Sequence, residues 1–172
     1  SAAGRAWHVG TVRDAWWGTG RGGPATVEYA DKIANTLLMK DAAGSGRITE
    51  LVKQRRAIMT LFYTFEERNQ AIEFYMHRRA LGLRTQDLED EEIIPDYLRL
   101  GGPEGVRRDA SVEEITHLIH RGGITPAYPE IQERLERATY AAIERGFYNP
   151  QDGLPEDSYA DEFLAYGLDI FY

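Results

Sequence analysis

Two carboxylates and two imidazoles lie close together in one short segment, residues 113–120. They belong to Glu113, Glu114, His117 and His120. In an α-helix, where successive residues are about 100° apart, Glu113, His117 and His120 fall within an arc of ~60°, and Glu114 lies at its edge. The opposite side carries the apolar residues Val112, Ile115, Leu118 and Ile119. Carboxylate oxygens and imidazole nitrogens are common ligands of divalent metal ions, so this helix predicts a metal site.

The segment differs by one residue from a known zinc-binding pattern. In HExxH, two His residues at i and i+4 bind zinc from one helix face, and the Glu beside them acts as a general base. Glu114 and His117 match the Glu and the second His, whereas Glu113 stands in place of the first His. The segment therefore predicts either a metal site with an altered ligand or the remnant of one.

Exchanging an imidazole for a carboxylate changes the chemistry that such a site can support. Zinc held by His117, Glu113 and a further carboxylate would be neutralised, and it would lower the pKa of a bound water less than an ion held by neutral imidazoles. The harder ligand set also weakens the preference for zinc over manganese, magnesium or calcium. His120 could restore an imidazole, because it lies within the same arc. We therefore expect slower catalysis at neutral pH than in a site with two His ligands.

The last predicted helix, residues 158–172, supplies a further carboxylate. Glu162 lies on one stripe of this helix together with Tyr166 and Asp169. A Glu from outside the HExxH motif completes the zinc shell in one class of metallopeptidases. We therefore predict that the side chains of Glu113, His117 and Glu162 meet at a common point.

The composition limits the fold and the partners. The chain has 172 residues, which is enough for one compact domain with its own core. Its 28 acidic and 20 basic residues give a net charge of −8, which argues against nucleic acid as a partner. No apolar run approaches the ~20 residues that a membrane span needs. Because Cys is absent, any metal must be held by His and carboxylate side chains.

Helical periodicity dominates the chain around one clear strand. Helices are predicted over residues 25–39, 49–55, 64–80, 130–145 and 158–172, besides the helix that carries His117. Asp109 or Ser111 is expected to cap that helix, and Gly122-Gly123 to end it. The β-branched and aromatic residues of 57–64 predict a strand buried on both faces. The expected fold is α+β: a mostly helical single domain with a small sheet packed on the helix that carries His117.

Three other segments are predicted to be irregular. Residues 1–24 hold all three Trp among many Gly, and predict an irregular arm in front of a domain of residues 25–172. Residues 81–110 are acidic and then rich in Gly and Pro, which predicts an excursion over the surface. Residues 41–46 have the skeleton of a calcium loop, but Ala43 and Ser45 stand where carboxylates belong, so a plain turn is expected.

A predicted helix, loop and helix over residues 29–52 are followed by MTLFYT (59–64), EEITHLIH (113–120), YPEIQERLERATYAAIERGFY (128–148) and YADEFLAYGLDIFY (159–172). In this order, these segments resemble secreted zincin-like domains of bacteria and fungi. Those domains are related to the catalytic domain of anthrax lethal factor, and the resemblance covers residues 29–172. It implies a zincin-like fold with His117 and Glu162 as metal ligands and Glu114 as the catalytic Glu. It also implies zinc as the cofactor, a peptide or protein as the partner, and a secreted or extracytoplasmic location.

Several functions stay open on these residues. A metal-dependent peptide hydrolase would use Glu114 as the general base, and Tyr159 or Tyr148 to stabilise the oxyanion. The exchange at Glu113 favours instead a variant EExxH domain with a degenerate metal site and a silent binding or structural role. A third option is an interaction module whose C-terminal residues 170–172 dock into a larger chain. A Glu113/His117 pair is also typical of an ordinary solvated helix, where it contributes about 0.2–0.5 kcal/mol.

Overall fold

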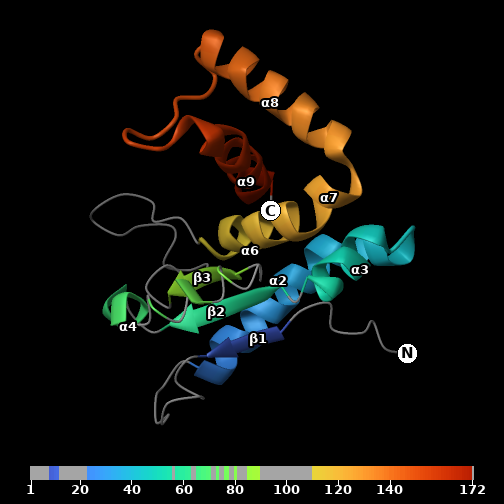
Figure 1. Cartoon of the computed structure of the whole chain (residues 1–172), viewed down its shortest axis with the longest axis vertical. Coiled ribbons are helices and arrows are strands. Elements are labelled where there is room, and N and C mark those ends of the chain that lie inside the picture. Colours follow the sequence, from blue (N-terminus) through green and yellow to red (C-terminus); the bar gives the residue numbers. More distant parts are fainter. Residues whose placement is uncertain are drawn as a thin grey trace.

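The computed structural model describes residues 8–11, 23–55, 57–62, 65–70, 73, 76, 77, 80, 85–89 and 110–171. Their order along the chain is shown by colour in Figure 1. The elements are β1 (His8–Thr11), α2 (Gly23–Ala43), α3 (Arg47–Gln54), β2 (Ile58–Phe62), α4 (Phe65–Gln70), β3 (Thr85–Glu89), α6 (Ser111–Ile119), η2 (His120–Ile124), α7 (Thr125–Ala127), α8 (Pro129–Glu144), η3 (Glu156–Ser158) and α9 (Tyr159–Phe171). The predicted α+β class, mostly helical with a small sheet, is confirmed.

The sheet has three parallel strands in the order β1-β2-β3. Parallel neighbours need a crossover connection, and α2 and α3 lie within the one between β1 and β2. The central strand β2 was predicted, and its burial on both faces is confirmed, because Met59, Thr60 and Leu61 are all buried.

Both edge strands contradict the sequence analysis. His8–Thr11 is a strand, so residues 1–24 are not irregular throughout, although the three Trp lie outside the described residues. Thr85–Glu89 is a strand within the stretch expected to run over the surface. Each edge strand is short, and β3 reads Thr-Gln-Asp-Leu-Glu, with one apolar residue among five. Such a strand is held by its neighbour's backbone, which local hydrophobic periodicity does not reveal.

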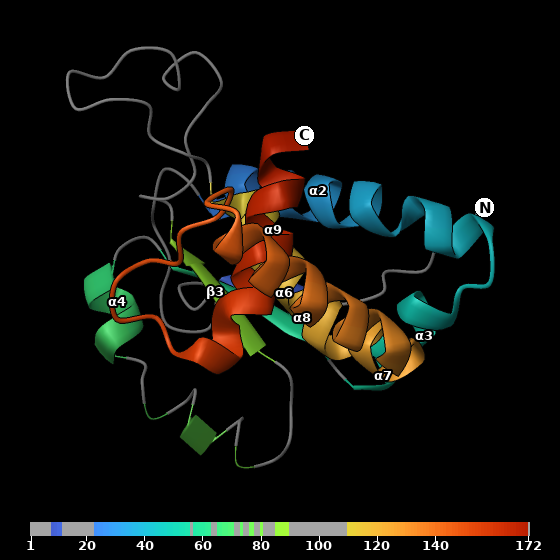
Figure 2. The same cartoon turned by 90° about the horizontal axis from the view of Figure 1, so that it is seen from above.

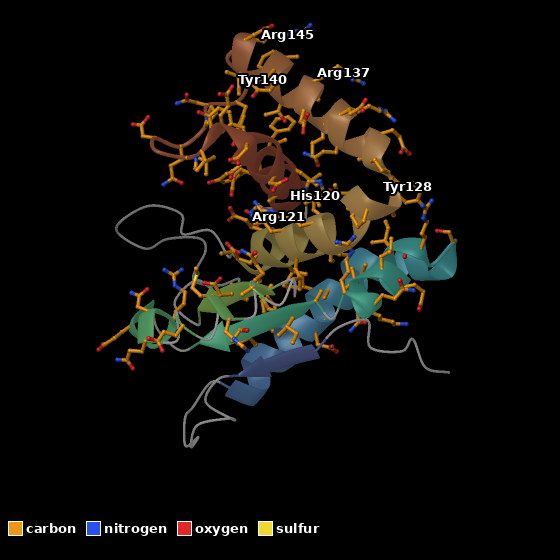
Figure 3. All side chains as sticks on the ribbon, in the orientation of Figure 1. His120, Arg121, Tyr128, Arg137, Tyr140 and Arg145 are labelled. Carbon is orange, nitrogen blue, oxygen red and sulfur yellow. The ribbon has the colours of Figure 1, made fainter. Side chains whose placement is uncertain are left out.

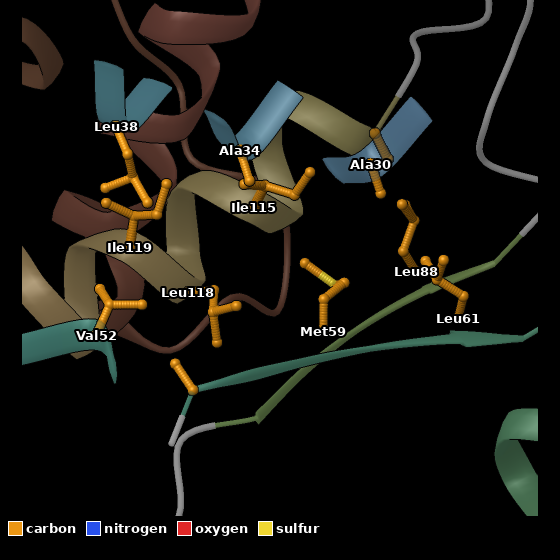
Figure 4. Packing of buried hydrophobic residues seen from close by; sticks show 12 residues of the cluster. Ala30, Ala34, Leu38, Val52, Met59, Leu61, Leu88, Ile115, Leu118 and Ile119 are labelled. Atoms are coloured by element: carbon orange, nitrogen blue, oxygen red, sulfur yellow. The ribbon is translucent and has the colours of Figure 1, made fainter. Parts of the chain in front are cut away.

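One face of the sheet carries the core. Leu61 on β2 and Leu88 on β3 are register partners and face the same side together with Met59. They pack with Ala30 and Ala34 of α2 and with residues of α6 such as Ile115 (Figure 4). Helix α2 contacts β1 and β2, α6 contacts β2 and β3, and the two helices contact each other. The predicted packing of the sheet on the helix that carries His117 is therefore confirmed.

Helix α9 covers the side of α6 that faces away from the sheet, and α8 lies against α9 (Figure 1). Helix α9 packs extensively on α6, and α8 contacts α7 and α9 (Figures 1 and 2). Helix α6 is thus enclosed between the sheet and α9. None of the helices in the described part of the chain has both the length and the apolar character of a membrane-crossing helix.

Helix α6 begins and ends differently from expectation. Its cap position is Ala110, which has no capping side chain, and Ser111 is already the first helical residue. Asp109, the other predicted cap, lies outside the described residues. Gly122 and Gly123 do not end the helix, because the chain continues as the π-helical turn η2 and then as α7. Both glycines are buried, and close packing against Ile48 and Val52 accounts for Gly123.

The turn over residues 41–46 joins α2 to α3 and uses its one acid as a cap. Asp41 Oδ2 accepts hydrogen bonds from the backbone N and the hydroxyl of Thr49 at 2.8 and 2.7 Å, and Oδ1 accepts one from Ile48 N at 3.3 Å. Burial alone would raise the pKa of Asp41, but these bonds outweigh it and hold the pKa below the ordinary 3.8. Gly46 turns the chain with φ of 65°. The carboxylate thus serves the start of α3, as in a plain turn.

Gly123 allows α3 to approach η2, and we predict that adding a methyl group there destabilises the fold. A Cβ on Gly123 would lie 2.6 Å from Ile48 Cγ2 and 2.8 Å from Val52 Cγ2. Gly123→Ala should therefore lower the free energy of unfolding by about 1–3 kcal/mol in urea titrations. Its neighbour is a matched control, since a Cβ on Gly122 would meet its nearest atom at 3.7 Å. Equal losses for Gly122→Ala and Gly123→Ala would contradict this account.

Candidate metal centre

Three side chains of α6 converge and form the candidate centre: Glu113, Glu114 and His117. Each offers a ligand atom, and these atoms all lie within 4.8 Å of one another. Glu113 and His117 are 7% and 4% exposed, and Glu114 is half-buried. The helix repeat brings residues 113, 114 and 117 to one side, and the enclosure of α6 by α9 removes most of the water from them.

The donor set fits a divalent cation. Ligand bonds of about 2.0–2.2 Å allow two atoms on one ion to be at most ~4.4 Å apart, so small side-chain adjustments would suffice here. The two carboxylates at this distance repel each other, and an ion between them would offset that repulsion. His117 also has a buried Nδ1 with no hydrogen-bond partner among the described residues. A buried imidazole nitrogen without a partner is costly unless a ligand or proton donor occupies the position.

Gln86 of β3 holds one of the carboxylates in place. Its Nε2 donates a hydrogen bond to Glu114 Oε2. The register sets Gln86 opposite Met59, whose side chain faces α6 from the sheet, so Gln86 points toward the same helix. Sequence analysis missed this residue because residues 81–110 were expected to cross the surface. A single polar Gln carries no signal that would have pointed to it.

Glu162 of α9 contacts His117, one of the three residues of the centre. Its Oε1 lies 3.4 Å from His117 Nε2, and its side chain is 20% exposed. Among the described residues, however, the group with mutual distances below 4.8 Å contains Glu114 rather than Glu162. The prediction that Glu113, His117 and Glu162 meet at a common point is therefore wrong: Glu162 contacts His117 but lies outside the converging group.

His120 contacts a carboxylate that sequence analysis did not single out. It is 1% exposed, and its Nδ1 lies 3.0 Å from Asp161 Oδ1. The other oxygen of Asp161 accepts a hydrogen bond from Arg121 Nε. Figure 3 shows His120 and Arg121 between α6 and α9. The structure thus brings His120 to α9 and Asp161, although the helical arc had suggested that it joins Glu113 and His117.

Asp161 is strongly held in its ionised form. Burial alone would raise its pKa, but the contacts with His120 and Arg121 outweigh that effect and lower the pKa from 3.8 to about 2. Asp161 is therefore a fixed negative charge at neutral pH, next in sequence to Glu162.

Tyr148, one of the two Tyr residues considered as oxyanion donors, has a buried hydroxyl. That hydroxyl has no hydrogen-bond partner among the described residues. Its ring centroid lies 5.2 Å from that of Phe163 and 6.5 Å from that of Tyr166. Burial raises the pKa of Tyr148, and the nearby charge of Glu162 raises it further. Tyr159 is the half-buried first residue of α9, and its role as a donor stays a prediction.

Comparison with known proteins identifies no relative of this chain. No protein-family model, no curated protein and no solved structure matches the chain.

The buried hydroxyl of Tyr148 leads to a stability prediction. Because an unpartnered buried hydroxyl costs free energy, Tyr148→Phe should leave the free energy of unfolding unchanged or raise it by about 1 kcal/mol. Tyr140 provides the control, since its hydroxyl donates to Glu156 Oε1 at 2.9 Å and Tyr140→Phe should bring no gain. Urea titrations of both variants without added metal make the comparison. A clear loss of stability in Tyr148→Phe would contradict the idea that this hydroxyl lacks a partner.

Proposed function

We propose that this chain is a zincin-like domain that binds a divalent metal ion through Glu113, Glu114 and His117, with Glu162 beside them. The observation that supports the proposal is the convergence of the three ligand atoms within 4.8 Å on a largely buried helix. The resemblance of the segment 113–120 to the HExxH pattern points to the same residues. The bound ion would supply Lewis acidity, while Gln86 and the packing of α9 hold the ligands.

The ligand set favours binding over rapid turnover. Two carboxylate ligands and one imidazole, with the carboxylate of Glu162 beside them, neutralise a divalent ion more fully than neutral imidazoles do, so the ion acidifies a bound water less. The same hard donors accept zinc, manganese or cobalt with less discrimination. We therefore propose a binding or structural domain with a degenerate metal site. Its partner would be a peptide or protein, and its location secreted or extracytoplasmic.

The first test of this proposal is metal binding itself. Purified chain dialysed against zinc should retain about one equivalent, and zinc at 100 times its dissociation constant should stabilise the fold by about 2.7 kcal/mol. His117→Gln should weaken zinc affinity at least about tenfold, because it removes a ligand. His77→Gln is the matched control, since His77 is exposed on another part of the chain. If zinc, manganese and cobalt all bind at under about 0.1 equivalent, the proposed metal site does not exist.

A second candidate function, metal-dependent peptide hydrolysis, is favoured by one specific observation. The buried hydroxyl of Tyr148 has no partner among the described residues and lies near enough to Glu162 to feel its charge. A hydroxyl in that environment could donate to the oxyanion of a substrate. Glu114, held by Gln86 through one oxygen, would then act as the general base with the other.

Turnover assays separate the two candidate functions. A hydrolase loaded with zinc should cleave peptides, and Glu114→Gln should lower the rate by about 10²–10⁴-fold, the usual contribution of a general base. Tyr148→Phe should also lower the rate, while zinc affinity stays unchanged. If the zinc-loaded wild type cleaves no member of a broad peptide library, the binding domain is supported and hydrolysis is rejected.

A further inference from the structure

We propose that Asp161 is a positioning residue of the metal centre: by contacting His120 and Arg121, it holds the first turn of α9 so that Glu162 faces His117. This inference rests on the proposed metal site. It assigns no ligand role to Asp161, His120 or Arg121.

Two neighbouring contacts between a His and an acid join α9 to the segment formed by α6 and η2. His117 Nε2 lies 3.4 Å from Glu162 Oε1, and His120 Nδ1 lies 3.0 Å from Asp161 Oδ1. His117 near the end of α6 and His120 at the start of η2 thus meet two consecutive acids of α9. Arg121, next to His120, contacts the second oxygen of Asp161. Both oxygens of Asp161 are therefore held from η2.

Geometry links the position of Asp161 to that of Glu162. The two residues are adjacent in the first turn of α9, and a helix is rigid over such a distance, so fixing one fixes the direction of the other. A rotation of α9 by one residue, about 100°, would turn Glu162 away from His117. Ala165 is fully buried one turn after Asp161 and has no polar group that could set the rotation of α9. The contacts of Asp161 supply that directional restraint.

Both residues that contact Asp161 belong to the π-helical turn. Helix α6 changes to η2 at His120, and π-turns inside helices are frequent at functional sites. His120 is completely buried, whereas Arg121 is partly exposed and reaches the same acid from the rim.

Zinc affinities of four proteins test the inference: wild type, Asp161→Ala, Glu162→Gln and the double variant, each measured by chelator competition. Loss of a residue that orients a ligand typically costs about 10–100-fold in metal affinity, and we expect this loss for Asp161→Ala. In the Glu162→Gln background, Asp161→Ala should change the affinity by less than about twofold, because the carboxylate that it orients toward His117 is already lost. Asp157→Asn, which removes an exposed acid one turn earlier, should leave the affinity unchanged.

Each outcome decides a different point. A loss of equal size in both backgrounds would mean that Asp161 acts through general stability, and would overturn the positioning role. Wild-type affinity in Asp161→Ala would overturn it as well, while the metal site would stand. Absence of zinc binding by the wild type would overturn the metal site itself. If Asp161→Ala does not fold, Arg121→Gln replaces it in the same cycle, and its smaller loss must likewise vanish in the Glu162→Gln background.

Discussion

Helix α6 is enclosed between the sheet and α9, and this enclosure constrains everything the molecule can do with its polar residues. All residues of α6 except Glu114 are buried, including Glu113 and His117. A buried carboxylate or imidazole costs free energy unless it is hydrogen-bonded, ion-paired or bound to a metal. The apolar side of α6 meets the core, as in any amphipathic helix. Its polar side meets a second helix instead of water, so its side chains must find their partners within the protein or in a ligand.

Local sequence predicts those helices and strands whose own residues have a clear hydrophobic pattern. Strand β2 is apolar along its length, and α6, α8 and α9 have helical periodicity, so all four could be predicted. Strands β1 and β3 are edge strands whose partner is β2, and only the assembled sheet reveals them. The pair Gly122-Gly123 illustrates the same limit. A helix-ending signal and a close-packing signal look alike in sequence, and the contact with Ile48 decides between them.

The same distinction holds for the candidate centre: contacts within one helix could be predicted, and contacts between elements could not. The spacing of Glu113, Glu114 and His117 is a property of one helix, and the structure brings these three together. The sequence analysis had placed Glu114 at the edge of the arc and given it the role of general base. Gln86 and Asp161 come from other elements and are matched to α6 by strand register and helix rotation, which a single sequence does not encode in readable form. His120 shows the consequence, because the helical arc placed it with the ligands. The change to a π-turn at His120 and the presence of Asp161 direct it to α9 instead.

The distribution of charge across the α6–α9 interface favours a cation at the centre over a purely internal ion-pair network. Arg121, the basic residue nearest to the acids of α9, is engaged by Asp161, whose pKa of about 2 reflects that balance. Glu162 has the imidazole of His117 as its neighbour, and an imidazole offers no permanent positive charge. A divalent ion would lie close to the carboxylates of α6 and to Glu162 of α9. Its position would therefore depend on how α9 is rotated relative to α6. Metal binding and helix packing would then stabilise the same arrangement of α6 and α9. The ion could hold α9 in place even if its ligands are poorly suited to activating water.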